Sequence, residues 1–420
     1  MIENSKKHRN TYGIYLMLIL IGIQLYDAYS SELYSRVQSL YLTELLISGK
    51  GFDSEEALAY LSRLMLPCYL FIMLAPACRA LADRFGRRNM LMVSVLGILI
   101  GGGICAKATS IYIFLLGNMV LNFSNSLDIH NFYIIEEMPQ ERQGVMRGIT
   151  GGIGALAAIS IPILRSIFVK DSVVGWRHLY ELVMLVGIVM LIFMQFVKET
   201  TAYKLLPRMF LSARKGNLKL QEQWKKLVVD FRNIWNEKKT YLFLLFVYGI
   251  ATAGITFYNE ALLSFSGLSE VMVERVLLIQ PIVCCVVMLL GGRMADCFGW
   301  KRVIIVQIVL AMTGCIGLVV LRGNVQMWCV TGICYGVMLG GYWSGYHLME
   351  LSILKEVVTQ RRGEGSAVIT YINGIGNAIG IGLLTVFIQV VALPIMKIGL
   401  VIPSLCLTLF LLKKVKVEGN

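Results

Sequence analysis

Three ionisable side chains lie in stretches that are otherwise apolar, where a charged group is energetically unfavourable. Asp27 follows the run "IYLMLILIGIQLY", and Asp128 and His130 interrupt a second apolar run between residues 111 and 134. A carboxylate near the middle of a membrane-spanning helix costs roughly 2.5 to 3.5 kcal/mol on insertion scales. Burial changes the proton affinity of such groups, so each can load and release a proton as its surroundings change. Asp27, Asp128 and His130 are therefore candidates for a proton site; the alternatives are a static or substrate-facing Asp27 and a packing role for His130.

Uncharged polar and aromatic side chains recur along the same apolar stretches. Asn118, Asn122 and Asn125 are spaced i, i+4, i+7, so they lie on one face of a helix. A polar face inside a membrane is expected to line a water-filled cavity. Interfacial anchoring explains several of the aromatic residues equally well. The candidates for a substrate cavity are Gln24, Tyr26, Asn118, Asn122, Asn125, Thr256, Tyr258, Asn259, Glu260, Gln280, Tyr342, Trp343, Tyr346, His347, Asn373 and Asn377.

The elements that must position these side chains are membrane-spanning helices. The chain is 57% hydrophobic and 15% charged, whereas a soluble domain is about 45 to 50% apolar and about 25% charged. A spanning helix needs roughly 20 apolar residues, and the 420 residues accommodate twelve of them. The sequence thus predicts an all-α membrane protein. The expected spans are 12–31, 57–79, 89–107, 111–134, 146–168, 178–197, 240–262, 271–292, 302–321, 325–348, 365–388 and 391–412.

The chain also contains an internal duplication. A shift of 213 to 215 positions superimposes Pro67 on Pro281, Asp83 on Asp296, Gly86 on Gly299, Glu136 on Glu350 and Arg147 on Arg361. Such self-similarity indicates a duplicated six-helix unit. The longest polar stretch separates the halves, and apolar residues at helical spacing within 220–235 predict an amphipathic helix on the inner membrane surface. The predicted domains are a six-helix bundle at 1–198, a cytoplasmic linker at 199–239 and a second bundle at 240–420.

Two charged segments, "ALADRFGRR" at 80–88 and "RMADCFGWKR" at 293–302, occupy corresponding places in the two halves. They resemble the G-x-x-x-D-[RK]-x-G-[RK]-[RK] signature of major facilitator superfamily transporters, found between helices 2 and 3 and again between helices 8 and 9. The second copy keeps Gly292, Asp296, Gly299, Lys301 and Arg302. The first keeps Asp83, Arg84, Gly86, Arg87 and Arg88, with Arg79 where the family has glycine. The resemblance covers the whole chain and implies two pseudo-symmetric bundles that transport by alternating access.

The inner ends of helices 4 and 10 carry further charged residues. "YIIEEMPQERQGVMRG" resembles the E-x-x-P-x-x-x-R-G element of sugar porters and metabolite:proton symporters, with Gln143 in place of the arginine. Exposed ion pairs are worth only about 0 to 1 kcal/mol each, so several must act together to hold a gate shut. The expected cytoplasmic gate comprises Asp83, Arg84, Gly86, Arg87, Arg88, Glu136, Arg142, Arg147, Asp296, Gly299, Lys301, Arg302, Glu350, Arg361 and Arg362. "LYDAY" around Asp27 likewise resembles a first-helix element of organic-acid:proton symporters, with Ala28 replacing glycine.

Other features narrow the function. The ten cysteines form no CxxC, and the chain has neither HExxH nor GxxxxGK[ST], so we expect no metal, no cofactor, no ATP hydrolysis and no enzyme activity. The net charge is +13, but with both termini cytoplasmic 29 of the 39 Lys and Arg lie on the inner side. The positive-inside rule then explains the charge without a nucleic-acid partner. We expect a monomeric multi-pass protein of the plasma membrane, specifically a bacterial inner membrane.

The resemblance implies a secondary active transporter for a small organic solute such as an organic acid or a sugar, with proton-coupled uptake. An efflux antiporter is the alternative, but the fifth helix lacks the G-x-x-x-G-P-x-x-G-G signature of drug:proton antiporters. A rival from another class is a transport-inactive nutrient sensor. The central linker and the short tail "KKVKVEGN" offer little for a signalling role.

Overall fold

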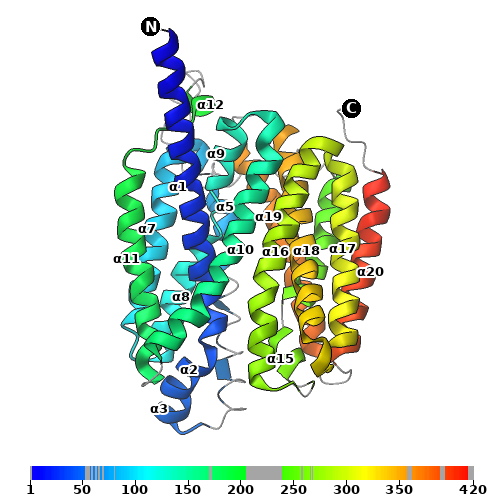
Figure 1. The fold of residues 1–420 in the computed structure, drawn as a ribbon. Helices are drawn as coiled ribbons and strands as arrows, with labels where there is room; N and C mark the ends of the chain where they lie inside the picture. The colour runs from blue at the N-terminus through cyan, green and yellow to red at the C-terminus, as the bar shows by residue number, and fades with distance from the viewer. Residues whose placement is uncertain are drawn as a thin grey trace. The chain divides into compact units, whose positions relative to one another are not determined.

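The computed structural model describes residues 2–52, 57, 60–61, 64, 67–68, 71–79, 81–169, 173–204, 239–256, 259–264, 266, 268–356, 362–387 and 393–414. Over these residues the secondary structure is helical, without a strand (Figure 1). Nine of the described helices are long and apolar enough to cross a membrane. The all-α membrane fold that composition predicts is confirmed.

The described residues fall into two compact units, and unit 1 comprises residues 1–136 and 153–205. In unit 1, α7 packs against α8 and α11, and α1 packs against all three. Aromatic rings fill its core, where Phe114 and Trp176 meet edge to face with centroids 5.4 Å apart. The helices of unit 1 are α1 (Ile2–Arg36), α2 (Gln38–Leu42), the π-helix η1 (Thr43–Ile47), α3 (Ser48–Lys50), α5 (Ala75–Arg79), α6 (Ala82–Phe85), α7 (Arg87–Ala106), α8 (Ile111–Asn125), α9 (His130–Glu137), η3 (Val173–Gly175), α11 (Trp176–Met194) and α12 (Thr201–Lys204).

Unit 2 comprises residues 137–152 and 206–420. Its centre is α18, which packs against α16, α17 and α19, while α20 packs against α17 and α19. A helix at Lys239–Thr256 also belongs to this unit. The other helices of unit 2 are η2 (Gln140–Arg142), α15 (Asn259–Ser264), α16 (Glu270–Phe298), α17 (Trp300–Leu321), η4 (Val325–Met327), α18 (Trp328–Glu356), α19 (Arg362–Phe387) and α20 (Leu393–Lys414).

The helix α10 (Gln143–Phe168) is shared, because its first ten residues cluster with unit 2 and the rest with unit 1. Its N-terminal part carries Gly144, Gly148 and Gly152, four residues apart. A Cβ atom placed on Gly148 would lie 2.7 Å from the carbonyl oxygen of Met288, and one on Gly152 would lie 3.0 Å from that of Cys285. Both carbonyls belong to α16. The glycine spacing therefore serves close helix packing.

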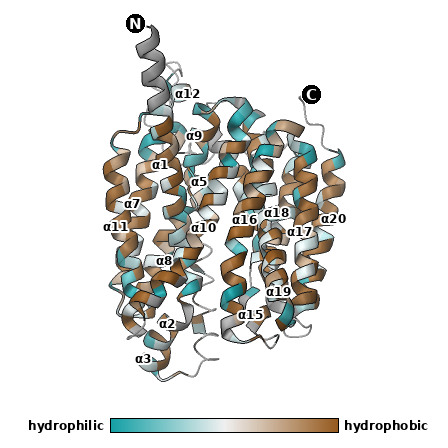
Figure 2. Ribbon diagram, viewed as in Figure 1, coloured by the Kyte–Doolittle hydropathy of each residue, from teal (hydrophilic) through white to brown (hydrophobic). Residues whose placement is uncertain are grey.

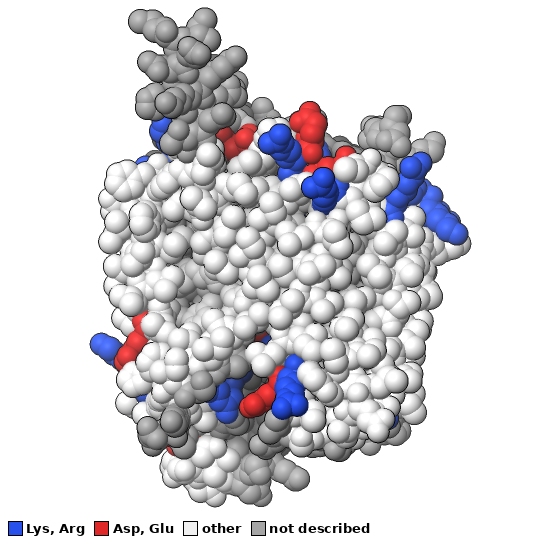
Figure 3. All heavy atoms as spheres, viewed as in Figure 1, with Lys and Arg blue, Asp and Glu red and all other residues white. Residues whose placement is uncertain are grey.

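The helix surfaces are those of a membrane protein. Figure 2 shows hydrophobic residues along the length of the helices in each unit, and large apolar side chains such as Leu18, Phe196 and Val320 are more than 60% exposed. On the face drawn in Figure 3, described Lys, Arg, Asp and Glu side chains gather near the helix ends. Apolar surface between two charged zones is what a lipid environment requires.

Most of the predicted linker lies outside the described residues. The predicted amphipathic helix at 220–235 lies there, and the described part of the linker is α12 with the residues just before it. The division of the chain at residues 198 and 240 stays a prediction.

Candidate functional site

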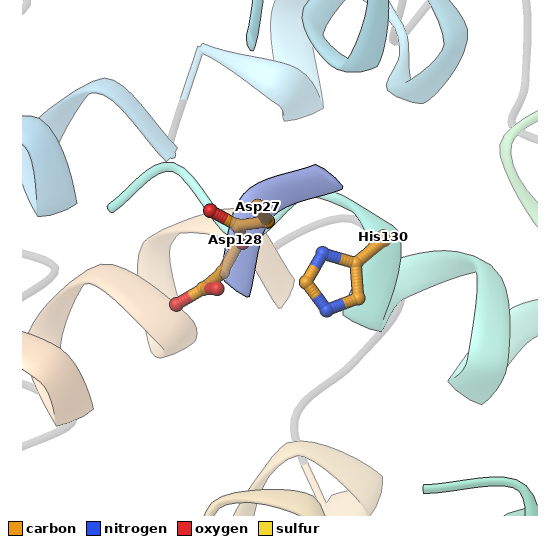
Figure 4. Close-up of side chains that lie close together, drawn as sticks. All are labelled: Asp27, Asp128 and His130. Carbon is orange, nitrogen blue, oxygen red and sulfur yellow. The ribbon is translucent and has the colours of Figure 1, made fainter. Parts of the chain in front are cut away.

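Asp27, Asp128 and His130 converge in unit 1 (Figure 4). One ligand-type atom from each of the three side chains lies within 4.8 Å of the other two. Asp27 comes from α1, Asp128 from the connection between α8 and α9, and His130 is the first residue of α9. His130 is buried, while the two carboxylates are partly accessible. The three candidates for a proton site, which come from two distant apolar runs of the sequence, thus form one cluster.

The fourth predicted span, 111–134, is wrong as a continuous helix. The chain leaves the helix after Asn125 and resumes it at His130. Asp128 has φ of 46° and is alone in a positive φ among the described residues other than glycine, a conformation that costs of order 1 to 3 kcal/mol. Non-helical backbone at membrane depth is tolerated where it is buried in protein or lines a cavity. The break brings Asp128 and His130 to Asp27.

Arg79 stabilises this break. Its side chain is 1% exposed, and its guanidinium donates to the carbonyl oxygen of Ser126 from Nε at 3.0 Å and from Nη2 at 2.9 Å. It also forms an ion pair with Asp128. The sequence marks Arg79 only as a departure from the glycine of the family signature, so its partner 49 residues away is a finding of the structure.

The asparagine stripe of α8 leads to the same cluster. Asn122 donates from Nδ2 to Oδ1 of Asn118 at 2.9 Å. One turn later Asn125 donates to Oγ of Ser30 at 3.3 Å, and Ser30 in turn donates to the carbonyl oxygen of Asp27 at 2.9 Å. Asn125 therefore ties α8 to α1 beside Asp27.

The other two cavity candidates of α1 differ in their surroundings. Gln24 is half-buried and lies against Gly154 of α10. Tyr26 is 2% exposed, and its hydroxyl lies against Gly187 of α11. Tyr26 thus packs between helices.

The candidates of unit 2 form an aromatic group on α18. Tyr342 is fully buried and stacks on Tyr248 with ring centroids 4.5 Å apart, and its hydroxyl is hydrogen-bonded to Thr252. Trp343 and His347, one turn apart, are less buried and stack on each other at 6.0 Å and 26°. Tyr346 contacts both rings. The half-buried face of this inner part of α18 is thus aromatic.

The remaining unit 2 candidates are divided among several contacts. Asn373 donates to the carbonyl oxygen of Leu245 at 3.3 Å, and Thr256 donates to that of Thr252 at 2.8 Å. Gln280 is buried on α16, and Asn377 is half-buried on α19. Tyr258 and the side chain of Glu260 lie outside the described residues.

Asn259 has a partner that sequence reasoning missed. The fully buried Lys397 of α20 donates from Nζ to Oδ1 of Asn259 at 2.6 Å and to the carbonyl oxygen of Gly254 at 2.7 Å. A lysine in the apolar run "VVALPIMKIGLVIP" is as unusual as Asp27 in its own run. The signal is the same in both cases: an ionisable residue within a long apolar run.

The predicted gate residues of unit 1 form a buried cluster. Arg87 is held by Asp83 at 2.7 Å and by Glu136 at 3.2 Å, with all three side chains 0% exposed. Thr200 donates to the second oxygen of Glu136 at 2.5 Å. The expectation of weak, exposed pairs is wrong here, because breaking a buried, hydrogen-bonded ion pair costs several kcal/mol.

Glu199 completes this cluster and was also missed. Its carboxylate accepts from the backbone N–H of Arg87 at 3.0 Å and of Arg88 at 3.3 Å, which are the first residues of α7. A negative charge at a helix N-terminus is favourable. Gly86 adopts φ of 97°, and a Cβ atom there would collide with Glu199. The remaining members, Arg84 and Arg88, lie on this turn: the carbonyl oxygen of Arg84 accepts from Tyr203 at 3.1 Å, and Arg88 donates to that of Gln195 at 2.8 Å.

In unit 2 the gate residues meet the start of α10. Asp296 accepts from the backbone N–H of Gly144 at 3.0 Å and of Val145 at 2.7 Å. Two residues further on, Arg147 lies 2.7 Å from Nδ1 of His347 and 3.8 Å from Glu350. Gly299, with φ of 86°, forms the turn from α16 to α17.

The remaining predicted gate residues are more accessible or lie outside the described residues. Arg142 and Arg302 are exposed and Lys301 is half-buried. Arg361 and the side chain of Arg362 lie outside the described residues.

Comparison with known proteins identifies the family. The family model described as "Major Facilitator Superfamily" matches residues 51–381. The chain belongs to this superfamily. It is therefore a multi-pass membrane protein of the major facilitator superfamily, as the two signature copies imply.

The curated relatives include several kinds of transporter. The uncharacterised MFS-type transporter YfiU of Bacillus subtilis is 26% identical over 30% of this chain and 25% of its own length. The glucose transporter GlcP of Staphylococcus epidermidis is 27% identical over 38% of this chain and 34% of its own length. The MFS-type efflux pump LUC4 of a Fusarium species is 24% identical over 28% and 21%. The aligned segments thus span about a third of these relatives or less.

Solved structures match over nearly the whole chain. The proton:xylose symporter XylE bound to 6-bromo-6-deoxy-D-glucose has a TM-score of 0.75 at 14% identity, covering 97% of both chains. The transporter FucP in the outward conformation has a TM-score of 0.69 at 12% identity, covering 95% of this chain and 97% of its own. The human organic anion transporter MFSD10 has a TM-score of 0.67 at 12% identity, covering 95% and 99%. At such identities these likenesses establish the fold alone.

Proposed function

We propose that this chain is a proton-coupled secondary transporter that takes up a small organic solute by alternating access. The observation that carries the proposal is the convergence of Asp27, Asp128 and His130 beside Arg79. Two carboxylates and one guanidinium leave a single excess negative charge when His130 is neutral. Such a cluster accepts one proton and becomes neutral, which is what a carrier needs for a proton to cross with its solute.

A sugar is the substrate class that the features of the chain favour. In unit 2, half-buried Trp343 offers an aromatic face, and the half-buried amides of Asn373 and Asn377 can pair with hydroxyl groups, as can that of Asn122 in unit 1. GlcP is named a glucose transporter, and XylE and FucP are named proton symporters of xylose and fucose. An organic acid is the second class, because LYDAY around Asp27 resembles the first-helix element of organic-acid symporters and MFSD10 is named an organic anion transporter.

The test is transport by purified protein in liposomes, with a panel of radiolabelled pentoses, hexoses, 6-deoxyhexoses and short carboxylic acids. We expect an inward pH gradient to drive accumulation of one class. Asp27→Asn keeps the size of the side chain but cannot take up a proton, so it should abolish pH-driven accumulation and retain solute exchange. The control variant is Lys107→Met, which removes an exposed charge just after the end of α7 and should behave like the native protein. Normal pH-driven accumulation by Asp27→Asn would refute the proton assignment.

An efflux antiporter is the second candidate, since LUC4 is named an efflux pump. In that case, a higher proton concentration outside the vesicles than inside drives solute out of preloaded vesicles and suppresses solute accumulation. Binding without any flux in either direction would instead support a nutrient sensor.

The topology is part of the proposal. In unit 1, the hydroxyl of Tyr12 accepts from the backbone N–H of Lys198 at 2.9 Å, so the start of α1 lies near the end of α11. Glu199 joins that same end to the turn at Gly86. The signature turns are cytoplasmic in our assignment, so both termini face the cytoplasm of a plasma membrane, and the two six-helix bundles at 1–198 and 240–420 move about the linker.

A further inference from the structure

His347 and Arg147 form a contact whose chemistry fixes a protonation state. Nη2 of Arg147 lies 2.7 Å from Nδ1 of His347. A guanidinium has only N–H donors, so Nδ1 must be the acceptor and carry no hydrogen. The imidazole is therefore neutral, with its hydrogen on Nε2. A proton on Nδ1 would remove the acceptor and place a second positive charge against the first.

Glu350 supplies the alternative partner. It follows His347 by three residues on α18, a spacing that brings two side chains of a helix together. One oxygen of its carboxylate lies 3.8 Å from Arg147, a distance longer than a hydrogen bond. The other oxygen lies 3.5 Å from the hydroxyl of Ser366 on α19. Arg147 and Glu350 are each about 5% exposed, so solvent screens their charges little. A protonated His347 can thus pair with Glu350 within α18, in place of the Arg147 contact between α10 and α18.

Two aromatic rings and a glycine of the neighbouring helix also lie beside His347 in the described part of the chain. Trp343 and Tyr346 flank it on α18, and Gly151 of α10 faces it: a Cβ atom placed there would lie 3.8 Å from Cδ2 of the ring. Further titratable groups at this end of unit 2 are Glu141 of η2, Arg293 and Asp296 of α16, Lys301 and Arg302 of α17, and Lys355 of α18. Asp296 already binds the amides at the start of α10, so it adds a fixed contact to the same segment.

We propose that His347 is a second proton-binding site, at which a proton taken up on Nδ1 releases Arg147 and unlocks residues 143–152 from α18. The inference deepens the proposed function and rests on it for its role in the transport cycle, because Arg147 is an assigned gate residue and the gate residue Asp296 binds the first amides of the same segment. It uses a group different from the Asp27 cluster, and it requires no ligand other than a proton from the cytoplasmic water. Histidine is the side chain whose unperturbed charge change falls between about pH 5 and 8, so it is the residue type suited to such a switch.

The direct test is nuclear magnetic resonance of the full-length protein, with ¹⁵N-labelled histidine, in lipid nanodiscs. The chain has four histidines, and His347→Gln assigns the signal. At neutral pH we expect His347 to carry its hydrogen on Nε2, with Nδ1 as a hydrogen-bonded acceptor. At about pH 5 the signal should become that of an imidazolium. A hydrogen on Nδ1 at neutral pH, or a ring that stays neutral at pH 5, would overturn the proposal.

Hydrogen exchange of residues 143–152 tests the consequence. After correction for intrinsic rates, protection of these amides should fall at least about tenfold between pH 8 and pH 5.5 in the native protein. His347→Gln, which cannot become charged, should keep high protection at both pH values, and His347→Lys, which is charged throughout, should show low protection at both. The matched control is His178→Gln, an exposed histidine of unit 1 paired with Glu181 at 2.8 Å, which should follow the native protein. A native pH response in His347→Gln would contradict the proposal.

The two proposals fail in different experiments. If the native protein moves no solute in liposomes, the proposal of proton-coupled transport fails. The tautomer and hydrogen-exchange measurements still decide whether His347 binds a proton and releases Arg147. If His347→Gln and the native protein carry solute into vesicles with an acidic interior at equal rates, the proposed role of His347 in the gate is refuted, even when transport is normal.

Discussion

At the scale of the residue, the candidate proton site depends on a balance of charge. Arg79 is almost fully buried and is held by Asp128 and by the carbonyl oxygen of Ser126. The same guanidinium reduces the net negative charge of the cluster and fixes the backbone that presents Asp128 and His130. A buried cation left without its carboxylate is unfavourable, whereas removal of both partners can be nearly neutral. Arg79 and Asp128 should therefore be energetically coupled.

A double-mutant cycle tests this coupling. Removal of one partner from a fully buried pair costs roughly 3 to 5 kcal/mol; because Asp128 is one-third exposed, we expect about 2 kcal/mol for Asp128→Asn and for Arg79→Met. The double variant should be less destabilised than the sum of the two single variants. Thermal unfolding of the purified protein in detergent measures the cycle, with the exposed Lys107→Met as a control for loss of charge. Additive effects would show that the pair is not coupled.

At the scale of the element, sequence reasoning succeeded where the pattern is local. The duplication superimposes Gly86 on Gly299, and both indeed have a positive φ, of 97° and 86°. The four-residue glycine spacing of α10 likewise agrees with its close packing on α16. Sequence reasoning failed where contacts with distant segments of the chain decide the local structure. The break at Ser126–Ile129 depends on Arg79, and the cap of α7 depends on Glu199, more than 100 residues along the chain. No periodicity within either segment encodes these contacts.

Alanine substitutions separate the two reasons for glycine in these turns. Gly86 and Gly299 share a positive φ that costs a residue with a Cβ of order 1 to 3 kcal/mol. At Gly86 a Cβ atom also collides with Glu199, whereas at Gly299 it meets no described atom within 4 Å. We expect the loss of stability in the order Gly86→Ala, then Gly299→Ala. The helical Gly374, which also has open space, should tolerate alanine without loss. Melting temperatures in detergent give the order; equal losses at Gly86 and Gly299 would remove the role assigned to Glu199.

At the scale of the whole molecule, the two copies of the signature have come to make different contacts. In the first copy Asp83 pairs with Arg87, four residues later on the same turn. The corresponding position of the second copy is Trp300, so Asp296 has no such arginine. It binds instead the N-terminus of α10, a helix that the duplication assigns to the other half of the chain. The duplicated sequence thus provides one stabilised turn and one latch between the sequence halves. An alternating-access equilibrium needs a bias of only a few kcal/mol, which a latch of this kind can supply.

Neutralising Asp296 should weaken this latch without removing it. Asp296→Asn keeps the shape and one oxygen acceptor but loses the charge that interacts with the start of α10. A charge at a helix terminus contributes about 0.5 to 2 kcal/mol, so protection of the amides of residues 143–152 should fall by roughly 2- to 30-fold. Glu141→Gln removes an exposed charge from the preceding turn and should change protection much less. Hydrogen exchange at constant pH compares the two variants, and solute counterflow in liposomes should show Asp296→Asn with an altered rate. If both variants exchange alike, the charge of Asp296 does not hold α10, and the Arg147 contacts must carry the latch alone.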